Sequence, residues 1–212
     1  MFPPSDRLRA LLRGAIAFTA LGAVGVVVLF FLVLRSGRAS LPVLSEVPDF
    51  VLTNQHGRVV TRSNLLGHVW IADIIFTRCA GPCPAMTRRL GELQSALPLE
   101  DSVRLVTLTT DPAHDTPEVL NLYAAKFGAQ PHRWLFLTGT KAQIAHLAVD
   151  GLKLTAVEKE PGQRASPDDL FIHSTIFVVV DRRGRVRCVL ESDQPGAKQK
   201  ALDAIRALLR ER

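Results

Sequence analysis

The sequence predicts an α/β domain preceded by one transmembrane helix. After residue 48, apolar runs typical of buried strands alternate with segments that have the three- and four-residue spacing of amphipathic helices. Residues 14–34 form a run of 21 residues without a charge, and a helix of that length crosses a hydrocarbon core of about 30 Å. We therefore expect a tail over 1–13, the span over 14–34, a linker over 35–48 and one domain over 49–212.

The apolar run predicts an uncleaved anchor rather than a secretory signal. It exceeds the apolar core of about 7–15 residues that signal peptides have, and no small-x-small cleavage site follows it closely. Arginines flank both ends, so the charge bias orients the span only weakly. We expect the tail in the cytoplasm and the domain on the periplasmic side of the inner membrane, because the cysteines described below suit that side.

The expected strands are apolar and rich in β-branched residues. The clearest is 68–76, a nine-residue run that suits a strand buried on both faces. Further strands are expected over 103–109, 134–137, 175–181 and 185–190. The polar turn 181–184 makes a hairpin of the last two.

The expected helices begin at recognisable sequence signals. Residues 79–97 carry apolar side chains at helical spacing, and Thr116 and Pro117 suit the N-cap and first residue of a helix that ends near 127. Helices are also expected over 140 to about 149 and over 199–209, whereas 151–169 gives weak signals. This order of strands and helices is that of a thioredoxin-like fold, with parallel pairing and right-handed crossovers.

Composition and charge argue against a nucleic-acid-binding protein. The formal net charge is +6, but from residue 41 onward the chain has 21 basic and 19 acidic residues. Aromatic residues are 6% and no basic stripe interleaves with them, so no nucleic-acid partner is expected. The arginines of the last hairpin are expected to form a solvated face, with docking of an acidic partner as the alternative: Arg182, Arg183, Arg185 and Arg187.

Cys79 and Cys83 carry the strongest chemical signal. They lie where the first βα turn meets a helix N-terminus, and there free N–H groups and the helix dipole favour a thiolate. A spacing of four places both side chains on one side of a helical turn, and Gly81 permits unusual backbone angles between them. The pair can close a disulfide or hold one soft metal ion, so both chemistries remain open at this point.

His173 is a candidate third ligand. It precedes the strand expected over 175–181, and in a thioredoxin-like fold the loop entering that strand lies against the cysteine loop. Redox members of the fold have a proline there, whereas this chain has a histidine and no proline between Pro167 and Pro195. Two thiolates and one imidazole form a soft three-ligand site suited to copper, while a structural zinc site normally has four protein ligands.

Three separated motifs resemble the Sco/SenC family of membrane-anchored copper proteins. They are the run 69–84 with its Cys-Ala-Gly-Pro-Cys-Pro, the stretch Asp-Pro-Ala-His-Asp-Thr-Pro over 111–117, and His-Ser-Thr-x-Phe over 173–177 followed by Val180 and Asp181. The resemblance covers about residues 43–210, almost the entire domain.

The resemblance implies a thioredoxin-like domain that binds Cu(I) or Cu(II) through Cys79, Cys83 and His173. It implies delivery of copper to the binuclear copper centre of cytochrome c oxidase, whose copper-centre subunit is the expected partner, or reduction of that centre's cysteines. Another copper carrier or a thioredoxin-like reductant is a further candidate partner. Asp111 matches a family aspartate that is a candidate to assist metal transfer, and a turn or N-cap aspartate is the alternative.

Two enzymes compete with the copper chaperone. The first is a thiol–disulfide oxidoreductase in which Cys79 and Cys83 cycle between dithiol and disulfide. The second is a peroxidase of the peroxiredoxin type, but Phe76 stands where that family's pattern has a threonine.

The remaining cysteine and histidines are expected to have no part in the site. Alternation places Cys188 on the same side of its strand as Val186 and Leu190, so we expect a small core residue, with a resolving or intermolecular thiol as the alternative. Four histidines have no spacing that joins them to the cysteine pair: His68, His114, His132 and His146.

Overall fold

The computed structural model describes residues 25–26, 40–97, 102–154, 156–163, 171–173 and 175–211. The chain divides into two compact units, Met1–Ser40 and Leu41–Arg212. The predicted span over 14–34 lies outside the described residues except for Gly25 and Val26, which are helical. No helix within the described ranges is long and apolar enough to cross a membrane.

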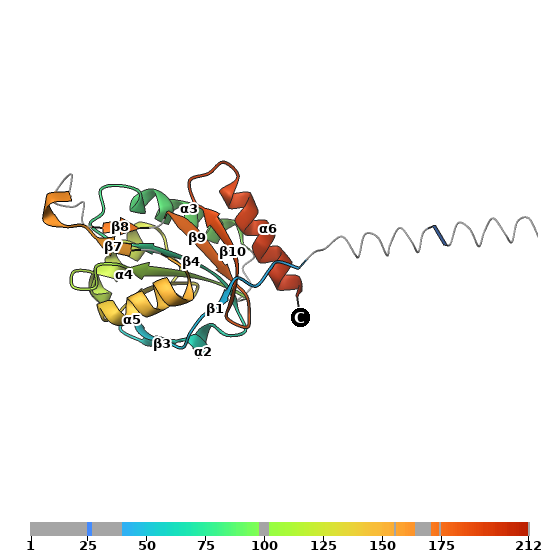
Figure 1. The fold of residues 1–212 in the computed structure, drawn as a ribbon, viewed down its shortest axis with the longest axis horizontal. Coiled ribbons are helices and arrows are strands. Elements are labelled where there is room, and N and C mark those ends of the chain that lie inside the picture. The colour runs from blue at the N-terminus through green and yellow to red at the C-terminus, as the bar shows by residue number, and fades with distance from the viewer. Residues whose placement is uncertain are drawn as a thin grey trace, which may run out of the picture. The chain divides into compact units, whose positions relative to one another are not determined.

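An eight-stranded mixed sheet forms the centre of the second unit (Figure 1). Its order is β1-β10-β9-β4-β5-β6-β2-β3. The central strands β4, β5 and β6 are parallel, whereas β9 and β2 pair antiparallel with the outer two of them. The bounds are β1 (Ser45–Glu46), β2 (Val51–Asn54), β3 (Val59–Thr61), β4 (Val69–Ile75), β5 (Val103–Thr109), β6 (Trp134–Thr138), β9 (Ile176–Val180) and β10 (Arg185–Glu191). The predicted α/β class is confirmed.

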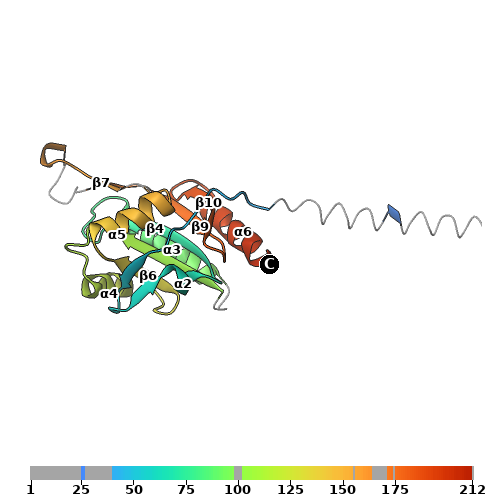
Figure 2. The same ribbon diagram turned by 60° about the horizontal axis from the view of Figure 1, so that its bottom comes forward.

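Helices cover both faces of this sheet (Figures 1 and 2). They are α2 (Arg62–Leu65), α3 (Cys83–Ala96), α4 (Pro117–Lys126), α5 (Lys141–Ala145) with the π-helical turn η1 (His146–Gly151), and α6 (Ala197–Arg210). One buried cluster includes Leu90 of α3, Leu120 of α4 and Ile205 of α6. The cluster on the other face includes Leu65 and Ile144. Two layers of helices therefore enclose the central strands.

The strands that sequence analysis did not predict are short. β1, β2, β3 and the one-turn helix α2 all lie between residues 45 and 65, and none exceeds four residues. Segments of two to four residues contain too few positions to show a period of two or 3.6. Because β1 pairs with β10 and the compact unit begins at Leu41, residues 41–48 of the expected linker belong to the domain.

Two predicted helices have different bounds in the structure. The helix expected from residue 79 begins at Cys83 with Pro82 as its N-cap, whereas residues 80–82 form a bend. The helix expected over 140–149 ends as α-helix at Ala145 and continues as η1. The N-cap prediction at Thr116 is confirmed, since the Val119 N–H donates to its hydroxyl at 3.4 Å.

A second, two-stranded sheet lies within the region of weak sequence signals and just after it. β7 (Ala156–Glu158) pairs antiparallel with β8 (Phe171–His173), with the short 3-10 turn η2 (Pro161–Gln163) between them. His173 is thus the last residue of β8 and leads into β9.

Cys188 shares its side of β10 with Leu190, as predicted, but not with Val186. The pairing register of β10 with β9 shifts between Val186 and Cys188. Val186 therefore belongs to one buried cluster, whereas Cys188 and Leu190 pack against the other. A bulge of this kind changes which side of the sheet the following residues occupy. Burial raises the pKa of the Cys188 thiol above its usual range.

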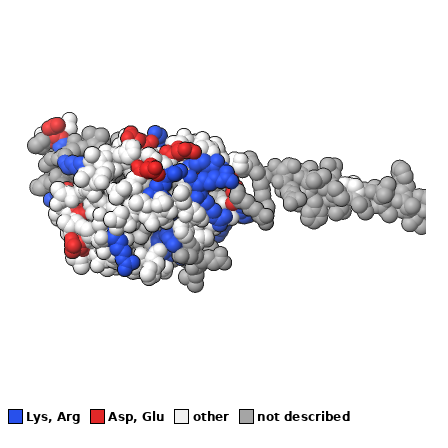
Figure 3. All heavy atoms as spheres, turned by 90° about the horizontal axis from the view of Figure 1, so that it is seen from below, with Lys and Arg blue, Asp and Glu red and all other residues white. Residues whose placement is uncertain are grey.

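Arg187 is buried, so the prediction that it belongs to a solvated basic face is wrong. Figure 3 shows Lys and Arg side chains gathered at one end of the domain next to acidic side chains, but only 3% of the Arg187 side chain is exposed. Its guanidinium lies 2.8 Å from Asp181 and 2.7 Å from Glu211, and it donates to the Leu41 and Pro42 carbonyls. This cluster joins the start of the domain to the end of α6.

Replacing Arg187 by Met is expected to lower the free energy of unfolding by about 3 kcal/mol, because Asp181 stays buried with one cationic partner fewer. Urea unfolding of the full chain in detergent, followed by tryptophan fluorescence, measures the change. Arg185→Met is the matched control, because Arg185 contacts the same carboxylate but its side chain is 26% exposed. Its expected loss is under about 1 kcal/mol, and equal losses would contradict a special role for the buried arginine.

Candidate metal centre

The candidate centre begins at the carboxyl end of β4, where the chain turns into α3. The Cys79 N–H donates to the Phe76 carbonyl (3.2 Å) and closes a turn. Pro82 is the N-cap and Pro84 lies in the first helical turn, where a missing N–H costs no helical hydrogen bond. Cys83 is therefore the first residue of α3, while Cys79 lies in the turn before it. We call residues 76–82 the cysteine turn.

The two cysteines differ in exposure. Cys79 has 9% of its surface exposed and Cys83 has none. The Gly81 N–H donates to the Cys79 Sγ (3.3 Å), and neither cysteine is in a disulfide. Residues 80–82 between them are exposed. The thiol pair is therefore approached from this turn and closed on the side of the core.

The hydrogen bond with the Cys79 side chain, followed by burial, raises the pKa of the Cys83 thiol far above its usual range. The charges of Cys79 and Asp73 raise this pKa further, whereas a backbone hydrogen bond with Phe76 lowers it. The prediction that the helix N-terminus favours a thiolate is thus wrong for Cys83, since burial and the neighbouring thiol outweigh the dipole. A bound cation would reverse the balance, because a coordinating thiol loses its proton.

Polar contacts support Cys83 from within the core. The Thr87 hydroxyl donates to the Cys83 carbonyl (2.9 Å) and lies 3.0 Å from the Tyr123 hydroxyl. Burial raises the pKa of Tyr123 above its usual range, so the phenol stays protonated and can donate to Thr87. Asp73 is fully buried in β4, and its charge contributes to the raised pKa of both Cys83 and Tyr123.

Asp115 connects the cysteine turn to the loop after β5. Its fully buried carboxylate accepts hydrogen bonds from the Thr77 N–H (3.1 Å), the Thr77 hydroxyl (2.5 Å) and the Thr109 hydroxyl (2.5 Å). The parallel neighbours β4 and β5 end at the same edge of the sheet, which brings these residues together. Sequence analysis assigned Asp115 no role, although its place between a buried strand and the N-cap Thr116 was a usable signal.

The predicted accessory residue Asp111 lies beside the cysteine turn, where it forms an ion pair. The Nη2 of Arg78, the residue before Cys79, lies 2.6 Å from the Asp111 Oδ2. Asp111 is 7% exposed, and its N–H donates to the Thr109 hydroxyl (2.9 Å). The Asp111 carboxylate is therefore paired with the Arg78 guanidinium rather than open to a metal ion.

His114 lies nearer to the cysteine turn than its spacing in the sequence indicated. Its Nδ1 is 3.0 Å from the Asp115 Oδ1 and 3.4 Å from the Thr77 Oγ1. Within the ranges that the structure describes, no three His, Cys, Asp or Glu side chains form a group that could hold a metal ion. His114 thus belongs to the hydrogen-bond network around Asp115.

The candidate ligand His173 is described by its backbone, and its side chain lies outside the described part of the structure. β9 pairs antiparallel with β4, with Val178 opposite Ala72 and Val180 opposite Trp70. Continued backwards along β9, this register places Ile176 opposite Ile74. The chain between His173 and β9 therefore arrives at the end of β4 that carries the cysteine turn.

Comparisons with known proteins identify the family of this chain. A model of the family "SCO1/SenC" matches residues 40–210. The "SCO1 protein homolog" of Bacillus subtilis is 34% identical over 164 residues, which are 76% of this chain and 82% of that protein.

Two solved structures have folds similar to that of this chain. BsSco, described as a member of the Sco family of cytochrome c oxidase assembly proteins with a disulfide switch, aligns with a TM-score of 0.69 and 29% identity. That alignment covers 82% of this chain and all of the other. Copper-bound ScoI of Bradyrhizobium japonicum aligns with a TM-score of 0.65 and 25% identity over 77% of this chain and all of that one. The thioredoxin-like Sco fold is thus confirmed, and the chain belongs to the SCO1/SenC family.

Proposed function

We propose that this chain is a membrane-anchored copper chaperone that delivers copper to the binuclear copper centre of cytochrome c oxidase. The observation that carries the proposal is the pair of thiols in hydrogen-bond contact, Cys79 reachable from solvent and Cys83 fully buried. The ScoI relative, whose structure contains copper, supports copper as the cargo.

The proposed ligands are Cys79, Cys83 and His173. Thiolates favour Cu(I), and an imidazole broadens the set toward Cu(II). The chain from His173 into β9 arrives at the cysteine end of β4, which supports His173 as the third ligand. A three-coordinate site leaves room for an incoming ligand, so a partner's cysteines and histidines can replace these ligands one at a time.

The proposal places the domain outside the cytoplasmic membrane. Residues 14–34 would anchor it, with the tail 1–13 inside the cell. The copper-centre subunit of the oxidase would be the acceptor, and another copper carrier the donor. A thioredoxin-like reductant would keep Cys79 and Cys83 reduced between deliveries.

Copper titration of the fully reduced full chain in detergent tests this function. One tight equivalent with a sulfur-to-copper charge-transfer band, lost in Cys79→Ser, is the expected result. Stopped-flow mixing with the apo copper-centre domain of the oxidase from the same organism should then show the band decay as copper moves. A chain that binds no stoichiometric copper would contradict the proposal.

A thiol–disulfide oxidoreductase is the second candidate. It is favoured by the contact between the two thiols and by the disulfide switch described for BsSco. In that reaction the Cys79 thiolate would attack a disulfide of the target, the target's leaving thiolate would take up a proton, and Cys83 would resolve the mixed disulfide. Rapid reduction of the copper-centre domain's disulfide by the copper-free dithiol would favour this candidate.

Replacing His173 by Ala is expected to weaken Cu(II) binding at least tenfold and Cu(I) binding much less, because two thiolates alone suit Cu(I). Competition titrations with chelators for each oxidation state measure both affinities. His132→Ala is the control, since His132 is exposed and no contact of it with the cysteine turn is described. Unchanged affinities for both oxidation states in His173→Ala would exclude His173 as a ligand.

Replacing Arg78 by Gln is expected to change the Cu(II) spectrum, because it releases the Asp111 carboxylate 2.6 Å away beside the cysteine turn. The double variant Arg78→Gln/Asp111→Asn should restore the original spectrum, since the added oxygen ligand is gone. EPR of the three copper-loaded proteins measures this. Identical spectra for Arg78→Gln and the wild type would show that the ion pair does not control access of Asp111 to the metal.

Apparent copper affinity is expected to rise with pH. The pKa of the Cys83 thiol is raised, so the thiol holds its proton across the neutral range and copper must displace it. Each displaced proton makes the apparent affinity rise about tenfold per pH unit below the thiol pKa. Cu(I) competition titrations at pH 6, 7 and 8 measure the slope, and a pH-independent affinity would contradict thiol ligation by Cys83.

A further inference from the structure

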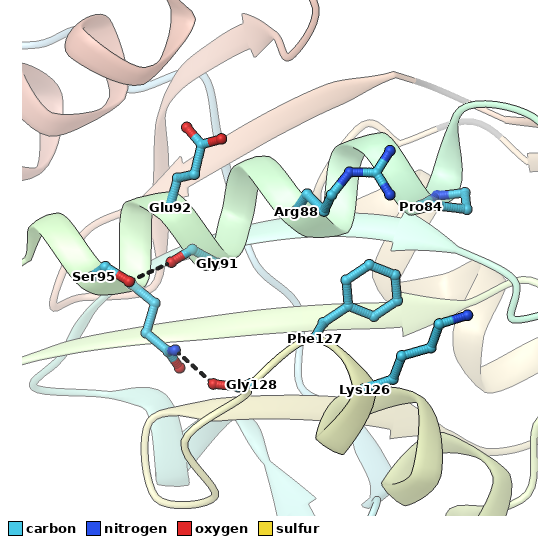
Figure 4. A pocket seen from close by; sticks show the side chains of 9 residues that line it. Pro84, Arg88, Gly91, Glu92, Ser95, Lys126, Phe127 and Gly128 are labelled. Carbon is cyan, nitrogen blue, oxygen red and sulfur yellow. Dashed lines mark hydrogen bonds between the residues drawn. The ribbon is translucent and has the colours of Figure 1, made fainter.

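A groove runs along α3 from the cysteine motif, and its walls come from α3 and from the end of α4 (Figure 4). It has a volume of about 690 Å³. Besides Gln94, the α3 wall is one helical row: Pro84, Arg88, Gly91, Glu92 and Ser95. At 1.5 Å per residue this row is about 16 Å long, the length of about five residues of extended chain.

One end of the groove is closed by fixed contacts between its walls. The Gln94 side chain donates to the Gly128 carbonyl (3.0 Å) and accepts from the Gln130 N–H (2.9 Å). A Cβ on Gly91 would lie at ordinary contact distance, 3.6 Å, from the Phe127 carbonyl, so α3 lies against this loop. The walls are therefore held at a set separation.

The other end is basic and lies next to the cysteines. Figure 4 shows Phe127 between Arg88 of α3 and Lys126 of α4, toward the Pro84 end. Arg88 and Lys126 are exposed, and no carboxylate of the described residues pairs with either. Among the described residues that line the groove, the one acid is Glu92, and its carboxylate lies 3.6 Å from the Lys198 ammonium. Pro84 follows Cys83 directly, so this basic end borders the turn through which the thiols are reached.

We infer that this groove binds an extended acidic segment of the copper-receiving protein, an inference that rests on the proposed function. Arg88 and Lys126 would bind its carboxylates, and an apolar side chain of the segment would pack on the half-buried Phe127 ring. Because Cys83 and Arg88 belong to the same helix, a segment held in the groove has a fixed position relative to the thiols. This position brings the partner's metal ligands to the exposed turn over Cys79.

The test is association of the full chain, reduced and without copper, with the copper-centre domain of the oxidase from the same organism. Biolayer interferometry in low salt measures the dissociation constant. The variant Arg88→Glu/Lys126→Glu should weaken association at least tenfold, mainly through a slower association rate. The control Lys200→Glu/Arg210→Glu makes the same charge change at exposed positions of α6 and should change it less than twofold.

Three outcomes would overturn the inference: equal weakening by both double variants, no weakening by the groove variant, and no association of the wild type. Binding of inorganic phosphate that the groove variant abolishes, with association unchanged, would assign the groove to a small anion instead. Copper titration of Arg88→Glu/Lys126→Glu separates a failure of the groove inference from a failure of the proposed function. If this variant binds copper like the wild type but associates weakly, the groove is the docking site. If the wild type associates but binds no copper, the proposed chaperone function is refuted and the docking site is not.

Discussion

The buried carboxylate of Asp115 is the contact on which the site depends. A carboxylate without water is costly unless hydrogen bonds replace its hydration, and here two threonine hydroxyls and a backbone N–H do so. Two of these three donors belong to Thr77, two residues before Cys79. The cysteine turn is therefore fastened to the neighbouring strand's loop at its start, while Pro82 and Pro84 fix its end. A turn held at both ends keeps the thiols in contact.

The same contacts at the two ends of the cysteine turn explain why the two cysteines differ in exposure. Cys83 begins a helix whose inner side packs into the core, and its carbonyl accepts a hydrogen bond from Thr87, whose hydroxyl also contacts that of Tyr123. Cys79 remains in the turn, where the Gly81 N–H reaches its sulfur. In the proposed carrier, an incoming ligand would meet the less buried Cys79 before Cys83. In a thiol reductant, Cys79 would be the attacking sulfur for the same reason.

Sequence reasoning succeeded where a pattern extends over many residues or has a specific local cause. The seven residues of β5 were predicted without error, and the hydroxyl of Thr116 caps α4 as its position before Pro117 indicated. It failed where tertiary contacts decide. The bulge in β10 separates Cys188 from Val186, so the two side chains lie on opposite sides of the sheet. Arg187 is buried because its guanidinium pairs with Asp181 and with Glu211, which follows α6. No periodicity carries that information.

The candidate site shows the same division. Cys79 and Cys83 are recognisable because adjacent thiols at a βα turn are rare without a chemical purpose, whereas Asp115 and Arg78 act through partners more than thirty residues away. Their roles depend on the parallel pairing of β4 with β5, which places the ends of both strands at one edge. The groove follows from that same edge, because α3 and α4 are the helices that leave β4 and β5 there. The pairing of β4 with β5 thus positions the cysteine turn, the Arg78–Asp111 ion pair and the basic groove together. A partner bound in the groove would already be aligned with the cysteine turn.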